Sequence, residues 1–255
     1  MTNILRQMYE QIFPYETRLW LYKHRHMEDY RRLRTRINSS EKGDFSLKPY
    51  DEFQCIFIHI TKTAGTSVAK SLFGYLPYHY TALDYRVIYG RKIFKKYFKF
   101  AFVRNPWDRL YSAYRYLKAG GWDDKDRSWS ESSLSEFNTF SDFVKHWLSS
   151  DNIKTHLHFR PQCYFVCDNR NNLLIDHLAY FETINEDFSL LRNHLNPSCE
   201  LGKHNTNPGK DYRLVYDDES IEIVSKVYAQ DIVRFGYDFD GIKSRIVLDN
   251  DPLFH

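Results

Sequence analysis

The feature that most constrains this chain is a short apolar run, residues 55–60, that leads into a turn of small residues. The run is too short for a helix and is rich in β-branched and aromatic residues, which predicts a buried strand. The turn contains Lys62 and Gly65, and residues 68–73 follow as the start of a helix. The first amide groups of a helix lack intrahelical acceptors and the helix dipole is positive there, so this arrangement predicts a cradle for an anion.

A second strand and helix follow the same plan. Residues 100–103 predict another buried strand, Asn105 a helix N-cap and Pro106 the first helical residue, and Gly120 ends the helix. Arg104 stands where this strand ends. Because ligands of open α/β sheets lie at the carboxyl ends of the strands, we expect Arg104 at the ligand-binding edge.

An arginine and a hydroxyl are suited to bind a terminal phosphate, and Ser112 lies about two turns into the second helix. Alternatively, Arg104 only forms an ion pair with Asp108 in the first turn of that helix. The turn that contains Lys62 and Gly65 does not match the G-x-x-x-x-G-K-[ST] loop of nucleoside triphosphate-binding proteins, because Lys62 precedes Gly65 and no glycine lies upstream.

Together the two segments resemble the sulfotransferases that use 3′-phosphoadenosine 5′-phosphosulfate (PAPS). Residues 58–67 look like their 5′-phosphosulfate-binding loop, and residues 102–114 look like their 3′-phosphate-binding strand and helix. The likeness is greatest to the carbohydrate O-sulfotransferases, which include bacterial and Golgi enzymes, and extends through residues 158–162, 180–188 and 231–237. Thr61 departs from the proline that this family commonly has, at a position that needs shape more than a ring.

The resemblance implies an α/β, P-loop-like three-layer fold with a central, mainly parallel sheet flanked by helices. It also implies in-line transfer of a sulfuryl group from PAPS to a hydroxyl of a carbohydrate acceptor (a polysaccharide, oligosaccharide or glycolipid), which leaves the nucleotide product PAP. The residues expected to bind the nucleotide are Lys62, Thr63, Ala64, Gly65, Thr66, Ser67, Arg104 and Ser112. No metal ion is expected, because PAPS has no γ-phosphate for magnesium to bridge.

Two residues are expected to act in catalysis, Lys62 and His79. Lys62 would stabilise the charge that builds on the leaving oxygen. An acceptor hydroxyl must lose a proton as it attacks sulfur, and His79, between the two segments, resembles the base histidine of related glycan sulfotransferases. The alternative is that His79 is an ordinary surface-loop residue with no part in catalysis. His59 is the rival candidate. On a buried strand we interpret it as a hydrogen-bonded core histidine, unless its side of the strand faces the cleft.

By the same resemblance, His158, Arg160 and Gln162 would line the acceptor or cofactor pocket. The alternative is a loop held by its own polar contacts. His156 and His158 with Cys163 and Cys167 fit no familiar zinc spacing, so we predict no zinc site.

Three further segments complete the prediction. Residues 122–136 are polar and mixed in charge, which predicts a long loop that selects the acceptor. Residues 202–213 look like the late loop that folds over the nucleotide in this family, although Lys203 and Asn207 depart from its pattern. The last helix is expected from about residue 217 to just before Gly236.

At 255 residues, of which 42% are apolar and 17% aromatic, the chain can form one α/β domain with its own core. We expect this domain at residues 51–245, a basic helical extension and linker at residues 1–50, and a C-terminal tail at residues 246–255. The linker would occupy residues 38–49. The basic amphipathic helix before it would contact an acidic glycan or a membrane surface, or simply dock with a solvated basic face.

No apolar leader and no apolar run near 18 residues is visible, and the four cysteines form no disulfide framework. These features favour a reducing compartment and a cytoplasmic, bacterial enzyme, or one trimmed of its anchor. Two other classes share parts of the pattern. One is a P-loop-type kinase, and the other is a non-catalytic binder of acidic glycan or nucleic acid; we expect no nucleic-acid partner.

Overall fold

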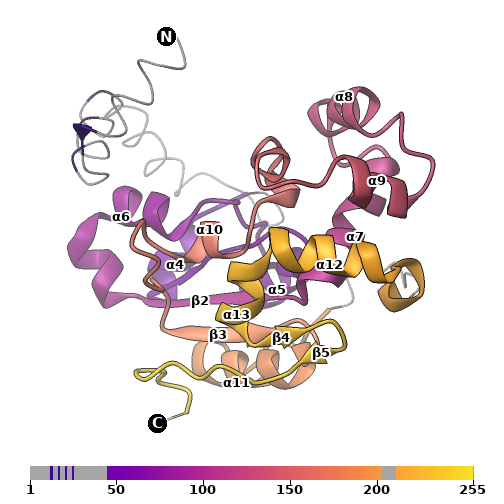
Figure 1. Cartoon of the computed structure of the whole chain (residues 1–255). Coiled ribbons are helices and arrows are strands. Elements are labelled where there is room, and N and C mark those ends of the chain that lie inside the picture. The colour runs from indigo at the N-terminus through magenta and orange to yellow at the C-terminus, as the bar shows by residue number, and fades with distance from the viewer. Residues whose placement is uncertain are drawn as a thin grey trace.

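A computed structural model describes residues 45–202 and 211–254, together with residues 12, 13, 17, 21 and 25. The central sheet consists of β1 (Cys55–Phe57), β2 (Phe98–Val103) and β3 (His177–Tyr180), which are parallel and adjacent in that order. Helices surround this sheet (Figure 1). The predicted α/β fold with a parallel sheet flanked by helices is confirmed.

The strands are nearly continuous apolar segments, as expected when both faces of a parallel sheet are covered. Phe57 pairs with Phe100 in register, and their rings stack with centroids 4.9 Å apart. The first predicted strand is shorter than expected, because only its first three residues pair as β1. The chain beyond it stays buried, and the Ile58 amide still donates to the Phe100 carbonyl at 2.9 Å.

Helices α5 (Gly65–Phe73) and α7 (Pro106–Lys118) follow β1 and β2, so their N-termini lie where those strands end. Asn105 caps α7 by accepting a hydrogen bond from the Trp107 amide at 3.0 Å, as predicted. Gly120 follows the helix with a left-handed φ of +94°. Between the two units, α6 (Ala82–Lys96) begins with a capping box of Thr81 and Asp84.

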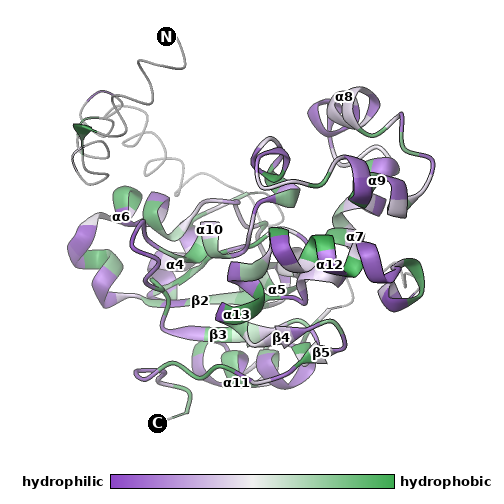
Figure 2. Cartoon of the chain, in the orientation of Figure 1, coloured by the Kyte–Doolittle hydropathy of each residue, from purple (hydrophilic) through white to green (hydrophobic). Residues whose placement is uncertain are grey.

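A second apolar cluster lies beside α7 and is built by α9 (Phe140–His146), a 3₁₀ helix η2 (Leu157–Phe159) and α12 (Asp218–Val227). Helix α8 (Asp124–Ser133) packs against α7 at its outer side. The prediction of a loop at residues 122–136 is therefore wrong. Figure 2 shows α8 as largely hydrophilic, so it has no apolar stripe to indicate a helix. Its start is instead fixed by Asp123, which accepts from two amides of the first turn.

Helix α10 (Cys163–Val166) packs against α6 and α13 (Ala229–Phe235), and α11 (Ile184–Leu195) packs against β3 and α5. The remaining elements are η1 (Asn152–Lys154), η3 (Tyr212–Val215), β4 (Tyr237–Asp238) and β5 (Gly241–Ile242). The last helix, predicted as one, is two. The chain breaks between α12 and α13 at Tyr228, whose buried hydroxyl donates to the Phe159 carbonyl at 2.6 Å.

The ends of the domain are packed. Helix α4 (Lys48–Glu52) begins inside the predicted linker at residues 38–49, and Ser46 and Leu47 before it are buried. The basic helix predicted before the linker lies outside the continuously described residues. In the C-terminal segment, Asp251 is buried and its carboxylate lies 2.7 Å from Nδ1 of His177. Helices in the described ranges are all too short or too polar to cross a bilayer.

Candidate active site

The turn after β1 is wound in an unusual conformation. Lys62 and Ala64 both have left-handed backbone angles, with φ of +66° and +62°. Such residues cost about 1–3 kcal/mol each and concentrate at functional sites. Ala64 is the N-cap of α5 and its methyl group cannot accept a hydrogen bond, so no side chain caps this helix. The Thr63 hydroxyl donates to the Ile60 carbonyl at 2.9 Å, which fixes the turn. The start of α5 is thus shaped as an anion cradle.

Gly65 is among the residues expected to bind the nucleotide, and the structure shows the His59 ring packed against it. A Cβ atom there would lie 1.8 Å from Cδ2 of His59, so the absent side chain makes room for the His59 ring. That ring is buried and its Nδ1 has no hydrogen-bond partner, so the interpretation of His59 as a satisfied core histidine is wrong.

We expect Gly65→Ala to destabilise the protein, because the new methyl group must displace the His59 ring from a close-packed site. Overpacking of this kind costs about 1–3 kcal/mol, or a melting temperature lower by roughly 2–10 °C for a domain of this size. Thermal unfolding of the variant measures the effect. In the double variant His59→Ala/Gly65→Ala the second substitution should cost little. An equal cost of Gly65→Ala with and without the ring would contradict the assigned contact.

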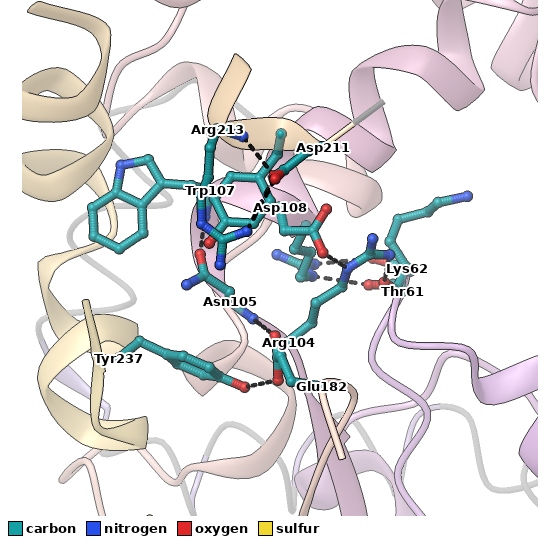
Figure 3. A network of polar contacts seen from close by, with 12 residues as sticks. Thr61, Lys62, Arg104, Asn105, Trp107, Asp108, Glu182, Asp211, Arg213 and Tyr237 are labelled. Carbon is teal, nitrogen blue, oxygen red and sulfur yellow. Dashed lines mark hydrogen bonds and ion pairs between the residues drawn. The ribbon is translucent and has the colours of Figure 1, made fainter. Parts of the chain in front are cut away.

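Arg104 joins the two predicted segments. Its Nε donates to Oδ2 of Asp108 at 2.8 Å, and its Nη1 donates to the Lys62 carbonyl at 3.1 Å (Figure 3). Its guanidinium also lies over the Phe181 ring at 4.0 Å. The alternative ion pair with Asp108 is therefore present, and Arg104 reaches the Lys62 turn at the same time. The ends of β1 and β2 meet as one site.

The backbone around Arg104 is held by buried polar groups. The Gln162 side chain forms two hydrogen bonds with the Arg104 backbone. Its Oε1 accepts from the Arg104 N–H at 2.9 Å, and its NH₂ group donates to the Arg104 carbonyl at 2.8 Å. Glu182 accepts from the Asn105 amide at 2.6 Å and from the Tyr237 hydroxyl at 2.8 Å (Figure 3). Gln162 is fully buried, so any part it takes in a pocket passes through Arg104.

Arg109 is a functional candidate that the sequence pattern did not single out. Its buried guanidinium donates to the Thr61 carbonyl at 2.9 Å, to the Thr61 hydroxyl at 3.0 Å and to the Arg160 carbonyl at 2.9 Å. Burial, with Arg104 and Arg109 nearby, lowers the pKa of Lys62 to about 8. Three cationic side chains therefore lie close together here, with the carboxylates of Asp108 and Asp126 beside them.

Ser112 and Tyr116 continue the face of α7 that begins with Asp108. Residues four apart lie on one side of a helix, so Ser112 lies between the Arg104 contact and Tyr116. The Lys62 amine lies 3.8 Å from the centroid of the Tyr116 ring. Ser112 on α7, Arg104 just before that helix and Lys62 in the turn after β1 thus border the same region.

His79 stands beside this region, although it lies on the loop before α6. Its Nδ1 is 3.4 Å from the His59 carbonyl, and its ring centroid is 4.3 Å from that of His59. A carbonyl can only accept, so Nδ1 carries the proton and Nε2 is left to accept one. Burial lowers the pKa of His79, which keeps it neutral near pH 7. The ring is half-buried and in contact with His59, so His79 is not a fully exposed residue of a surface loop.

The ring of His158 is 6.3 Å from that of His79 and 4.8 Å from that of Tyr116. Burial lowers its pKa to about 4, and its Nδ1 has no hydrogen-bond partner. Arg160 lies over the Tyr164 ring at 4.5 Å and donates to the Lys154 carbonyl at 3.3 Å, so part of this loop is held by its own polar contacts.

The late loop predicted at residues 202–213 lies mostly outside the described residues. At its end, Asp211 and Arg213 pair at 3.1 Å (Figure 3). In residues 45–202 and 211–254, no three His, Cys, Asp or Glu side chains are grouped to hold a metal ion.

The model of the sulfotransferase family matches residues 79–238, which are 160 of the 255 residues of the chain. This range contains His79, Arg104, Ser112 and His158, and the Lys62 turn lies just before it. Searches of the curated proteins and of the solved structures find no significant match. The chain therefore belongs to the sulfotransferase family, whose members are transferases of the sulfuryl group.

Proposed function

We propose that this enzyme uses PAPS as the donor and sulfates a hydroxyl group of a carbohydrate. The observation that carries the proposal is the contact of Arg104 with the Lys62 carbonyl at 3.1 Å, beside the half-buried imidazole of His79. Two anion-binding places and one neutral base thus lie within one site. A donor with a phosphosulfate at one end and a phosphate at the other is suited to such a pair of places.

The residues present fit this donor. The 5′-phosphosulfate would be held by Lys62 and by the turn at residues 63–67, where α5 lacks a side-chain cap. The 3′-phosphate would be held by Arg104 and Ser112. Three cationic side chains converge here, and burial with the other two lowers the pKa of Lys62, so added negative charge is favourable.

The chemistry follows from the placement of the charges. PAPS supplies a sulfuryl group, and its transfer breaks the bond from sulfur to the phosphate oxygen and leaves PAP. Nε2 of His79 takes the proton of the acceptor hydroxyl as that oxygen bonds to sulfur. The Lys62 amine stabilises the negative charge on the leaving oxygen.

A carbohydrate acceptor is supported by two aromatic residues, one beside Lys62 and one exposed after α7. Tyr116 borders Lys62, and the side chain of Trp122 is 74% exposed just after α7. Exposed aromatic rings offer sugars a flat apolar face with polar groups at its edge. His158 and Arg160 remain our candidates for contacts with the acceptor.

The experiment that tests the proposal is a transfer assay with ³⁵S-labelled PAPS against polysaccharides, glycosaminoglycans and glycolipids, with mass spectrometry of the product. Labelled sulfate attached to a sugar hydroxyl supports it. Transfer only to a peptide, a phenol or a steroid would contradict the carbohydrate assignment and leave the donor assignment standing.

Calorimetric titration should show that PAP binds at least tenfold more tightly than ATP with magnesium, because the turn does not match a nucleoside triphosphate loop and the site has two separate anion positions. Arg104→Ala should remove most of the PAP affinity. A preference for ATP would instead support a kinase. Tight binding of an acidic glycan with no effect of Arg104→Ala would support a non-catalytic binder.

We further propose a cytoplasmic, bacterial enzyme that acts without nucleic acid. The four cysteines, all free thiols, support the reducing compartment. The basic segment before residue 45 would add contacts to an acidic glycan or a membrane surface. Binding of the full chain to vesicles with and without anionic lipid distinguishes these two roles.

A further inference from the structure

Asp126 lies close to the candidate active-site residues but has no role in the proposed transfer step. It lies in the first turn of α8, and its side chain is only 15% exposed although its neighbour Asp124 is 97% exposed. The turn before α8 is fitted to it, since a Cβ atom on Gly121 would lie 2.2 Å from that of Asp126. The helix therefore directs this carboxylate inward, toward α7.

The Asp126 carboxylate contacts groups from three separate segments. Oδ2 accepts from the Tyr116 hydroxyl at 2.8 Å and from the Trp122 amide at 3.0 Å. Oδ1 lies 3.3 Å from Nε2 of His156, and Oδ2 lies 3.8 Å from Nε2 of His158. Burial opposes ionisation, but the nearby His158 and the hydrogen bonds from the Trp122 amide and Tyr116 hold the pKa of Asp126 below its usual value.

The partners of Asp126 are the residues that border the two catalytic candidates. Tyr116 presents its ring to the Lys62 amine, and His158 packs against both Tyr116 and His79. A phenol and an imidazole without such an acceptor would have other rotamers open to them. The Asp126 carboxylate restricts the rotamers of both the Tyr116 and the His158 side chains.

We propose that Asp126 is a positioning residue, which fixes Tyr116 against Lys62 and His158 against His79. It thereby sets the distance between the Lys62 amine, which stabilises the leaving oxygen, and the His79 imidazole, which takes the proton of the acceptor. This inference rests on the proposed sulfuryl transfer. Asp126 itself is not placed against the reacting atoms, so its effect passes through the two rings.

The test compares Asp126→Asn with the matched control Asp124→Asn, a neighbouring carboxylate that forms an exposed ion pair with Arg127 on the surface. PAPS turnover is measured as PAP release with the acceptor that the panel identifies. We expect Asp126→Asn to lower kcat at least tenfold with the KM for PAPS unchanged, and Asp124→Asn to match the parent enzyme. In a cycle with Tyr116→Phe, the double variant should lose little more than Asp126→Asn alone.

A readout that needs no activity is the NMR spectrum of the protein with ¹³C-labelled histidine. The imidazole signals of His79 and His158 should move in Asp126→Asn, while that of His177, at the other end of β3 from the site, stays in place. Unchanged turnover, or additive losses with Tyr116→Phe, overturns the proposal. A shift of all histidine signals with a lower melting temperature also overturns it, because the role is then structural. If the parent enzyme transfers no sulfuryl group, the proposed function fails, and unmoved His79 and His158 signals alone then overturn the positioning role.

Discussion

Lys62→Ala should lower kcat by about 10²–10³ while the fold stays intact, because it removes the full positive charge nearest the leaving oxygen. The side chain packs on Tyr116 and has no buried ion-pair partner among the described residues, so its removal should cost little stability. Steady-state kinetics with PAPS and thermal unfolding measure the two effects. Lys70→Ala, in the last turn of α5, is the matched control and should leave both unchanged.

The same lysine predicts the basic limb of the pH profile. Its pKa is lowered to about 8 by burial first and then by Arg104, so kcat/KM for the free enzyme should fall as pH rises through about 8. Lys62→Ala should lack this limb. A variant with near-normal kcat, or one that keeps the limb, would show that another group carries the charge.

His79→Ala should lower kcat by about 10²–10⁴, the usual contribution of a general base. Burial lowers the pKa of His79, so its protonation and the acidic limb of kcat/KM should lie below about pH 6.5. The rate falls as pH drops through that value, because the protonated ring can no longer accept a proton.

Added imidazole should restore part of the rate to His79→Ala, which a merely structural loss would not allow. His146→Ala is the control, since His146 is exposed at the end of α9. If His79→Ala kept most of the activity, His158 would become the next base to test, although burial holds its pKa at about 4.

The parts of the fold that could be predicted are those with local causes. The strands ending at Phe57 and Val103 are apolar apart from Lys99, and α7 begins at an Asn-Pro pair that fixes its cap and first turn. Parallel strands end at one edge of a sheet, so Lys62 and Arg104 could be expected to meet. Their contact through the Lys62 carbonyl follows from that geometry.

The parts that could not be predicted depend on contacts between distant segments. Helix α8 has no apolar stripe, and its only local sign is the acidic cap at Asp123 with acidic residues in the first turn. Because these residues were predicted to form a loop, Asp126 was not identified as a candidate. The break at Tyr228 has no glycine or proline, and it depends on the carbonyl of Phe159, 69 residues earlier. Arg109 was missed because a helical arginine about one turn from a cap is usually solvated.

The fit of the His59 ring over Gly65 has a consequence for the kinetic mechanism. The His59 ring packs against Gly65 in the first turn of α5, and the His59 carbonyl lies 3.4 Å from Nδ1 of His79, so a movement of the loop would be passed on to the proposed base. Occupation of the phosphosulfate loop should therefore settle the base before the sugar arrives, which favours an ordered addition with the nucleotide first and PAP released last.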